Sequence, residues 1–526
     1  MRRPAVDNGF MTNIAGHHSQ SEIERKYDVE EGASVPDLSA VDGIASVETR
    51  EPVDLEAVYY DTDNLDLAVR RIVVRRRTGG GDAGWHIKKP AAEGRTELHW
   101  PLGNDTGTVP DALLEPISAW VRGRELTPIA RISTRRTAIH LLDADGNGVV
   151  EIADDEVAAT DVRRGGERSW REWEVELLDG APDTEDGRTA LLDQIEGLIA
   201  EAGAHPSSSV AKIARALGAD SLTEVLPEDH PGAVSADTPD QTGGDASAVV
   251  VGAIRNLVND LEQTDPAARA DEPDAVHRMR TIVRRLRSVL AAYRSLFDRD
   301  VTENLRDRLG ALGTALGNAR DIEVQAIRAE ALLDELGQPQ AAARARLVDG
   351  TRDRYTRAHR HLTTVLSSPE YFRLLDDLDE FVVHPPLNDD AATSAKKLVK
   401  KVLAREIRRV QKRADAVAGA SGDVESQLHE VRKAGRRLRY AAEAAEAARA
   451  GRSPSAAATG ERIQDTLGAH RDCVLFSAHL SQTAGRAEAA GEKTAIYASL
   501  SELSARSGTA ALAESTSALE DVRNLR

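Results

Sequence analysis

The chain has 526 residues, of which 41% are hydrophobic and 29% are charged, and its formal net charge is −19. A chain of this length exceeds one ordinary hydrophobic core, so the sequence predicts two or three domains. No segment is long and apolar enough to suggest a membrane span. The negative charge argues against bulk attraction to nucleic acid, and we expect neither a specific nucleic-acid partner nor a membrane partner.

Cys473 is the only cysteine in the sequence. An internal disulfide is therefore excluded, and a reducing, cytoplasmic location is expected. Residues 1–20 contain Arg2 and Arg3 but lack the apolar run of a secretory signal. We expect these residues to form a disordered leader.

Residues 21–217 are predicted to form a β-rich domain, because short β-prone runs alternate with turns that contain Gly, Asp or Pro. The segment 143–148 resembles part of a calcium-binding loop. β-prone runs flank it where helices would be required, so a hairpin turn is predicted instead. The β-prone runs are residues 57–60, 72–77, 85–88, 139–142 and 173–178.

Residues 218–246 are rich in Gly, Asp, Pro, Ser and Thr, which predicts a linker. Residues 247–526 show apolar residues at helical spacing, which predicts an all-α half. The pattern His-x-x-Arg-x-x-x-Arg-x-x-Arg begins at residue 277 and again at residue 429. This offset of about 150 residues predicts a duplicated helical bundle, with repeats at about 247–385 and 386–526. A second repeated pattern, Leu-Gly-x-x-Arg-Asp, is interpreted as a loop that caps helices; it covers residues 316–321 and 467–472.

Charged residues alternate along three of the predicted strands. Alternate residues of a strand share one face, so each set would point the same way. Any one set by itself is typical of a solvated strand face. Together they suit a closed barrel with a polar interior, where carboxylates hold Mg²⁺ and basic side chains hold phosphate oxygens. The sets are Glu22, Glu24 and Lys26; Glu174 and Glu176; and Arg75 and Arg77.

The first set resembles the Glu-x-Glu-x-Lys signature of the CYTH superfamily, the triphosphate tunnel metalloenzymes. The resemblance covers nearly all of residues 21–217 and implies an antiparallel β-barrel tunnel of the α+β class. It also implies metal-dependent hydrolysis of a terminal phosphoryl group. The further elements follow in the order of that family, at residues 59–62, 74–77, 85–88, 95–97, 134–135, 154–155, 174–176 and 212–216.

The resemblance implies roles for individual residues. Strand alternation favours Asp155 over Asp154, because Asp155 shares a face with Glu151, and Arg136 is an alternative to Arg135. The implied ligands of one or two Mg²⁺ or Mn²⁺ ions are Glu22, Glu24, Asp155, Glu174 and Glu176. The implied triphosphate-binding residues are Lys26, Arg75, Arg77, Lys88, Arg95, Arg135 and Lys212. The implied catalytic residues are Glu22, Glu24, Lys26 and Lys88.

Two Arg-rich stripes dominate the helical half. A helical periodicity places the basic residues of each repeat on one face, and Glu430 is the only carboxylate noted nearby. A single stripe of this kind is typical of a solvated face. Two copies favour a groove for a polyanion, because guanidinium groups pair bidentately with phosphate oxygens. A further basic run at residues 396–412 could line the same groove, although a solvated face is the favoured interpretation.

The stripes resemble the CHAD family, conserved-histidine α-helical domains that often follow CYTH domains. This resemblance covers residues 247–526 and implies inorganic polyphosphate as the ligand. The implied binding residues of the first repeat are His277, Arg280, Arg284, Arg285 and Arg287. Those of the second repeat are His429, Arg432, Lys433, Arg436, Arg437, Arg439 and Tyr440.

The sequence therefore predicts a multidomain protein with an N-terminal tunnel and a C-terminal duplicated all-α bundle. Its predicted function is hydrolysis of inorganic triphosphate, with polyphosphate bound by the helical half. A non-catalytic polyphosphate scaffold and a CYTH-type adenylyl cyclase are the alternatives. Organic or nucleoside triphosphates stay open as substrates, and polyphosphate granules are a compatible location.

Overall fold

The computed structural model describes residues 18–91, 94–103, 108–207, 209, 211–219, 246–337, 340–388, 394–418, 424–446 and 453–525. The described chain forms two compact units, one of strands and one of helices. Most of the leader predicted at 1–20 and of the linker predicted at 218–246 lies outside the described residues. The first strand begins at His18, so the last three residues assigned to the leader are strand.

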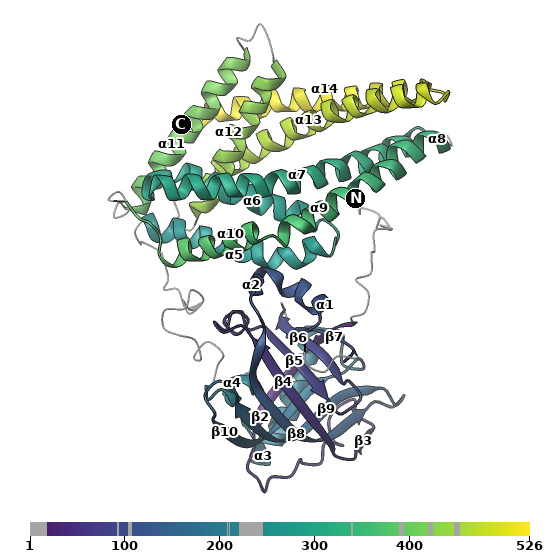
Figure 1. Cartoon of the computed structure of the whole chain (residues 1–526), viewed down its shortest axis with the longest axis vertical. Helices are drawn as coiled ribbons and strands as arrows, with labels where there is room; N and C mark the ends of the chain where they lie inside the picture. Colours follow the sequence, from purple (N-terminus) through teal and green to yellow (C-terminus); the bar gives the residue numbers. More distant parts are fainter. Residues whose placement is uncertain are drawn as a thin grey trace. The chain divides into compact units, whose positions relative to one another are not determined.

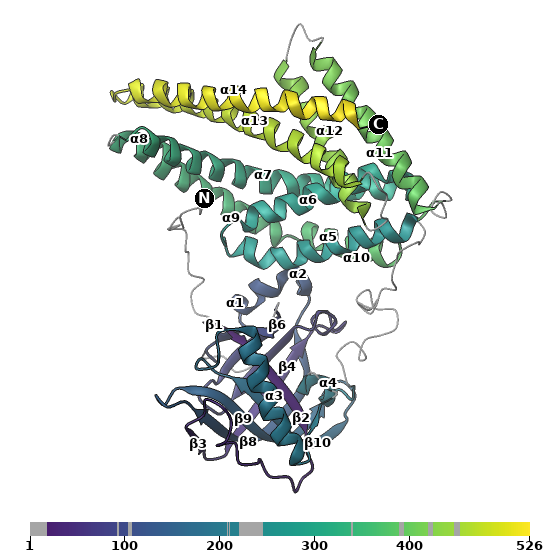
Figure 2. The same ribbon diagram turned by 180° about the vertical axis from the view of Figure 1, so that it is seen from behind.

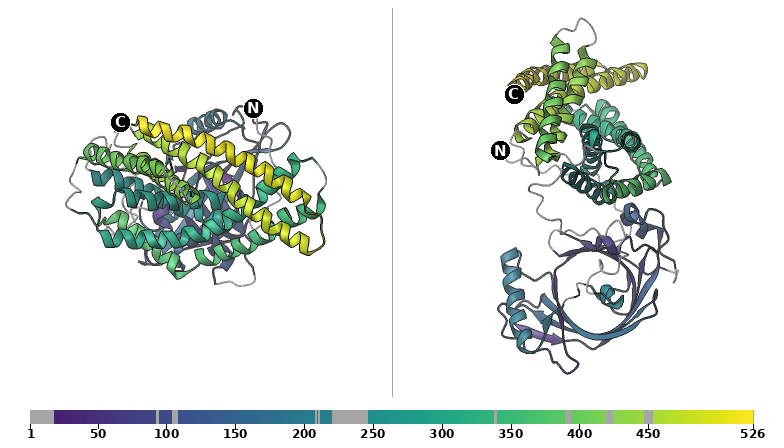
Figure 3. Two further views of the ribbon diagram at one scale, coloured as in Figure 1. Left: turned by 90° about the horizontal axis from the view of Figure 1, so that it is seen from above. Right: turned by 90° about the vertical axis from the view of Figure 1, so that its left-hand side faces the viewer.

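The strand unit is a single antiparallel sheet that closes into a tunnel, as predicted (Figure 3). β1 pairs with β7 at one edge of the strand order, and β2 pairs with β10 near the other edge. Only Ile23 separates β1 from β2, so the same stretch of chain joins both edges. The strands are β1 (His18–Glu22), β2 (Glu24–Asp28), β3 (Ser46–Thr49), β4 (Val53–Asp61), β5 (Val73–Thr78), β6 (Gly84–Pro90), β7 (Arg95–Trp100), β8 (Thr127–Leu142), β9 (Gly148–Asp161), β10 (Glu167–Leu177) and β11 (His205–Pro206).

Short helices cover the outside of the tunnel and fill part of its inside. α3 (Glu185–Glu201) packs its buried Leu and Ile side chains on Trp173 and Val175 of β10 (Figure 2). α1 (Asp111–Leu114), the 3₁₀ turn Glu115–Ile117 and α2 (Ser118–Val121) cover β5, β6 and β7. α4 (Lys212–Ala216) packs against the inward-facing side chains of β4 and β8.

Strand alternation separates the two faces of β10 as the sequence predicted. Trp173 and Val175 lie in the outer core at 0% and 1% exposure, whereas Glu174 and Glu176 line the interior. Charged side chains can therefore fill a closed barrel without disturbing its apolar outer packing. The segment 143–148 is the turn between β8 and β9, which confirms the hairpin prediction.

The helical unit carries α5, α6 and α7 early in the chain and α11, α12 and α13 later, the order expected of a duplicated bundle (Figure 1). α5 and α11 have 24 residues each, and α7 and α13 have 37 each. Among the described residues, no helix is long and apolar enough to cross a membrane. The helices are α5 (Ala246–Arg269), α6 (Ala275–Ala292), α7 (Arg299–Glu335), α8 (Ala341–Arg344), a π-helical turn (Ala345–Asp349), α9 (Gly350–Leu366), α10 (Pro369–Val383), α11 (Ala395–Ala418), α12 (Val424–Ala444), α13 (Ser453–Ala489) and α14 (Ala495–Asn524).

The two Leu-Gly-x-x-Arg-Asp segments are not loops, and this sequence interpretation was wrong. Both lie in the middle of the long helices α7 and α13. A Cβ added to Gly317 would meet the Arg280 guanidinium at 3.6 Å, and one added to Gly468 would meet Arg432 at 3.5 Å. These are ordinary van der Waals distances, so both glycines lie beside arginines of α6 and α12 within continuous helices.

Candidate functional site

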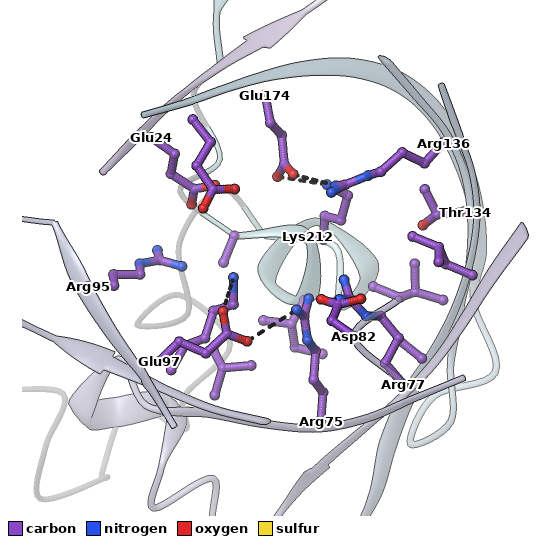
Figure 4. A pocket seen from close by; sticks show the side chains of 18 of the residues that line it. Glu24, Arg75, Arg77, Asp82, Arg95, Glu97, Thr134, Arg136, Glu174 and Lys212 are labelled. Atoms are coloured by element: carbon purple, nitrogen blue, oxygen red, sulfur yellow. Dashed lines mark hydrogen bonds and ion pairs between the residues drawn. The ribbon is translucent and has the colours of Figure 1, made fainter. Parts of the chain in front are cut away.

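The strand unit encloses a cavity of about 240 Å³ whose walls carry both signs of charge (Figure 4). β2, β9 and β10 supply carboxylates, and β5, β6 and β7 supply most of the basic side chains. The charged lining comprises Glu24, Lys26, Arg75, Arg77, Asp82, Lys88, Arg95, Glu97, Arg136, Glu151, Glu174, Glu176 and Lys212. All the tunnel residues predicted from the sequence are in this lining except Glu22, Arg135 and Asp155.

The acidic wall follows from the pairing of β2, β10 and β9. Glu176 lies directly between Glu24 on β2 and Glu151 on β9. Burial alone would raise the pKa of Glu24, but Lys26, 3.2 Å away, lowers that pKa overall. Glu24 is therefore ionised, and oxygen donors of this kind suit Mg²⁺ or Mn²⁺. The side chain of Glu22 lies outside the described part of the structure.

A second group of carboxylates surrounds the ammonium of Lys212. Its Nζ lies 2.8 Å from Asp155, 2.6 Å from Glu172 and 2.7 Å from Glu174. These three buried carboxylates are also close enough to one another to hold a metal ion. In the described structure α4 instead places a lysine among them, and a cation entering there would replace Lys212.

The ion pairs around Lys212 keep their members charged. Burial raises the pKa of the Glu174 carboxyl, but Lys212, Lys26 and Arg136 hold it well below the usual range. Burial lowers the pKa of Lys212, but its carboxylate neighbours raise it well above the ordinary value. In the described structure the carboxylates of the acidic wall are therefore neutralised by lysine and arginine side chains.

The basic wall is organised around Glu97 of β7. This carboxylate lies 3.4 Å from both Arg75 and Lys88, and 2.6 Å from Nδ1 of His86. Arg77, beside Arg75, forms an ion pair with Asp82 from the β5–β6 turn. Burial, together with Arg75 and Arg136, lowers the pKa of the Arg77 guanidinium to about 9. An anion bound beside Arg77 would relieve this crowding of positive charge.

One predicted residue, Arg135, faces away from the tunnel, and Arg136 takes the inward position. Thr134 and Arg136 line the cavity, so Arg135 between them lies on the opposite face of β8. Arg136 donates to both oxygens of Asp155 at 2.8 and 2.7 Å and to Glu174 at 2.7 Å. Asp155, favoured over Asp154 from the sequence, is fully buried and pairs with Arg136 and Lys212.

Asp154, the alternative to Asp155, instead pairs with Arg171. Sequence reasoning did not assign Glu172, Glu97 or Asp82. The same alternation that placed Glu174 inside would have placed Glu172 there as well. Alternation from Arg95 would likewise have placed Glu97 inside, whereas nothing in the local pattern marks Asp82.

The predicted stripes of α6 and α12 meet in the helical unit. We call Arg280, Arg284, Arg287, Arg432 and Arg436 the guanidinium cluster. Burial and then Arg284, Arg432 and Arg287 lower the pKa of Arg436 to about 9. Burial and Arg284 likewise lower the pKa of Arg432 to about 10. The Nε atoms of Arg284 and Arg432 are buried without a hydrogen-bond partner among the described residues.

Several predicted residues of the stripes have carboxylate partners, contrary to the expectation that only Glu430 lies nearby, and within the cluster Arg280 lies 3.0 Å from Asp321. Glu443 accepts from Arg285 at 2.6 Å and from Arg439 at 2.7 Å. Its partner Arg439 lies four residues earlier on α12, so this pair could have been found in the sequence. Arg437 lies 3.0 Å from the fully buried Glu406 of α11, which only the tertiary fold reveals.

The remaining predicted residues of the two stripes are two histidines, a buried tyrosine and a surface lysine. Burial lowers the pKa of His277 and of His429, with Arg320 and Arg471 respectively adding to the effect. Tyr440 is 2% exposed, and the Arg285 and Arg439 guanidiniums each lie 5.5 Å from its ring. Lys433 points to the surface and pairs with Glu430 at 2.7 Å.

Both units match known domain families. Residues 20–204 match the CYTH domain, and residues 252–481 match the CHAD domain. The uncharacterised proteins MT2285 and Rv2226 of Mycobacterium tuberculosis are each 36% identical over 493 residues, which cover 90% of this chain and 91% of theirs.

Two solved structures resemble the chain in part. One is PptA from Streptomyces chartreusis, at 21% identity and a TM-score of 0.44, covering 53% of this chain and 100% of that one. The other is the CHAD domain from the plant Ricinus communis, at 23% identity and a TM-score of 0.40, covering 54% and 92%. From the two domain matches and the full-length relatives, the chain belongs to the family of proteins that carry a CYTH domain followed by a CHAD domain.

Proposed function

We propose that this protein is a divalent-metal-dependent hydrolase of inorganic triphosphate whose CHAD domain binds inorganic polyphosphate. One observation carries the proposal: the tunnel sets ionised carboxylates of β2, β9 and β10 opposite buried cations of β5, β6 and β7. A metal–triphosphate complex has both charges that such a pair of walls would complement.

The residues of the acidic wall fit a divalent cation. Glu24, Glu174 and Glu176 would hold it, with Glu22 and Asp155 as further expected ligands. A bound cation would neutralise charge on the phosphate oxygens and help to align the substrate. Lys26 and Lys212 contact these carboxylates in the structure and would turn toward phosphate oxygens in the complex.

The basic residues would bind and orient the triphosphate. Arg75, Arg77, Lys88 and Arg95 would contact its oxygens, and Arg136 takes the place expected for Arg135. Burial strengthens each of these contacts, because the wall is largely shielded from water. The fixed positions of these cations would keep the terminal phosphoryl group in line for attack by water, without a covalent nucleophile on the protein.

The guanidinium cluster would bind polyphosphate without cleaving it. Its arginines face one another, and the only described carboxylate group that could hold a metal lies in the tunnel. Lys433, Arg285, Arg437 and Arg439 would contribute less than the cluster, because carboxylates already engage them.

Phosphate release from the purified full-length protein tests the proposal. We expect release from tripolyphosphate to exceed that from ATP and long-chain polyphosphate, and to stop when EDTA removes Mg²⁺ or Mn²⁺. A folded protein that binds polyphosphate but releases no phosphate from any of the three would instead be a scaffold. Cyclic AMP formed from ATP would support the cyclase alternative.

A further inference from the structure

The β5–β6 turn carries an acidic residue into the phosphate-binding wall. Asp82 lies in this turn, and its carboxylate forms an ion pair with Arg77 inside the ring of strands (Figure 4). The turn packs closely on β4: Gly79 has φ +83°, and a Cβ there would collide with the Asp54 carbonyl. His86 Nε2 also lies 3.1 Å from the Asp82 carbonyl oxygen. The backbone of the turn is therefore held in place.

The Asp82 side chain is held much less firmly than its backbone. Its exposed fraction is 59%, against 8% for the Arg77 side chain. Among the described residues its carboxylate pairs only with Arg77. Glu97, the other carboxylate of this wall, is 19% exposed and is fixed by His86, Arg75 and Lys88. A change of side-chain rotamer could therefore release Asp82 from Arg77 while Glu97 stays in place.

We infer that Asp82 is a built-in competitor for the phosphate site of Arg77, which an anionic ligand must displace in order to bind. The inference rests on the proposed function, because it takes Arg77 to contact a phosphoryl oxygen. Asp82 occupies the Nη2 end of the Arg77 guanidinium, so a phosphate that pairs with this end of Arg77 must first displace the aspartate.

This competition makes the tunnel selective for ligands that reach several cations at once. Orthophosphate or sulfate at Arg77 replaces one ion pair by another and gains little. A triphosphate at Arg77 also reaches Arg75 and Lys88, and those contacts offset the loss of the Asp82 pair. Selectivity arises from this difference in affinity. Asp82 would therefore weaken binding of the product orthophosphate more than binding of the substrate.

Asp82→Asn tests the inference, because it removes the charge and keeps the backbone of the turn. Calorimetric titration of the full-length protein with orthophosphate and with tripolyphosphate, without divalent cations, measures both affinities directly. We expect orthophosphate to bind about tenfold more tightly to the variant, and tripolyphosphate to gain less. Inhibition of tripolyphosphate hydrolysis by orthophosphate should strengthen in parallel. Asp82→Ser is a second neutral variant that a turn accommodates.

Asp54→Asn is the matched control, since it removes the same charge from the exposed face of neighbouring β4. Unchanged orthophosphate affinity in both Asp82 variants would overturn the inference, and so would an equal gain in Asp54→Asn. These titrations do not depend on turnover. Wild-type protein that binds tripolyphosphate without hydrolysing it would overturn the proposed activity and leave the test of Asp82 intact.

Discussion

The tunnel and the guanidinium cluster both gather buried cations, but they differ in counter-charge. In the cluster Arg280 lies 3.0 Å from Asp321, whereas Arg436 is surrounded mainly by other arginines. Lys212 has three carboxylates within 2.8 Å, and their attraction raises its pKa despite burial. Arg436 is also buried, but its nearest charged neighbours are other arginines, and its pKa falls to about 9. Burial lowers the pKa of both cations, but neighbouring charges raise the pKa of Lys212 and lower the pKa of Arg436.

This difference indicates what each unit needs as a ligand. The tunnel is close to neutral by itself, so a ligand must bring both signs to replace its internal ion pairs, as a metal–triphosphate complex does. The cluster has five guanidinium groups, and Asp321 and Asp472 offset only part of their charge, so a polyanion alone would complement the excess. Guanidinium groups stay protonated at physiological pH. The repulsion among the arginines of the cluster is therefore relieved by binding an anion and not by losing a proton.

Loss of one tunnel carboxylate should give the largest effect. Glu176→Gln removes a proposed metal ligand between Glu24 and Glu151, so metal-dependent tripolyphosphate hydrolysis should fall by at least about a hundredfold. Polyphosphate binding by the same protein should not change. Glu167→Gln, on the exposed part of the same strand, is the control and should hydrolyse like wild type. Wild-type turnover in Glu176→Gln would remove the functional contrast between the two units.

Loss of two cluster arginines should produce the complementary result. Arg284→Gln combined with Arg436→Gln should weaken polyphosphate binding by about a hundredfold and lower its salt dependence, because fewer phosphate charges are neutralised. Hydrolysis of tripolyphosphate should persist. Arg278→Gln, an exposed residue of α6 outside the predicted binding set, is the control. An equal loss in the control would show that general positive charge, rather than the cluster, binds the polyanion.

Alternation along single strands was enough to predict much of the tunnel. It placed Glu174 and Glu176 inside and Trp173 outside, because a strand has a fixed period of two. It failed at Arg135 and Arg136, which are adjacent and equally basic. Only the pairing of Arg136 with Asp155 across β8 and β9 fixes which arginine faces inward.

The helical half shows a different limit of sequence reasoning. Its repeat and its basic stripes were visible in the sequence, and the structure brings them together. Gly317, however, has a neighbourhood typical of a turn, although it lies within α7 beside Arg280. Likewise, the pairing of Arg437 with Glu406 depends on how α11 packs against α12. Contacts between distant segments were therefore the part that local patterns could not supply.

The smallest expected effect concerns the stability of the protein without ligand. It distinguishes charge repulsion at Arg436 from the contribution of Arg436 to polyphosphate binding. Arg436→Met removes a buried charge surrounded by like charges and retains much of the side-chain volume. We expect it to raise the free energy of unfolding by about 1 kcal/mol, or roughly 2–4 °C in melting temperature for a domain of this size. With saturating polyphosphate the wild type should melt at a higher temperature than the variant, because it binds the ligand more tightly and is stabilised more. Thermal melts with and without polyphosphate measure both, with Arg408→Met on the exposed face of α11 as the control. A variant that melts below wild type in both conditions would mean that Arg436 is a structural residue, and the cluster would then resemble the self-neutralised tunnel more than a site that requires an anion.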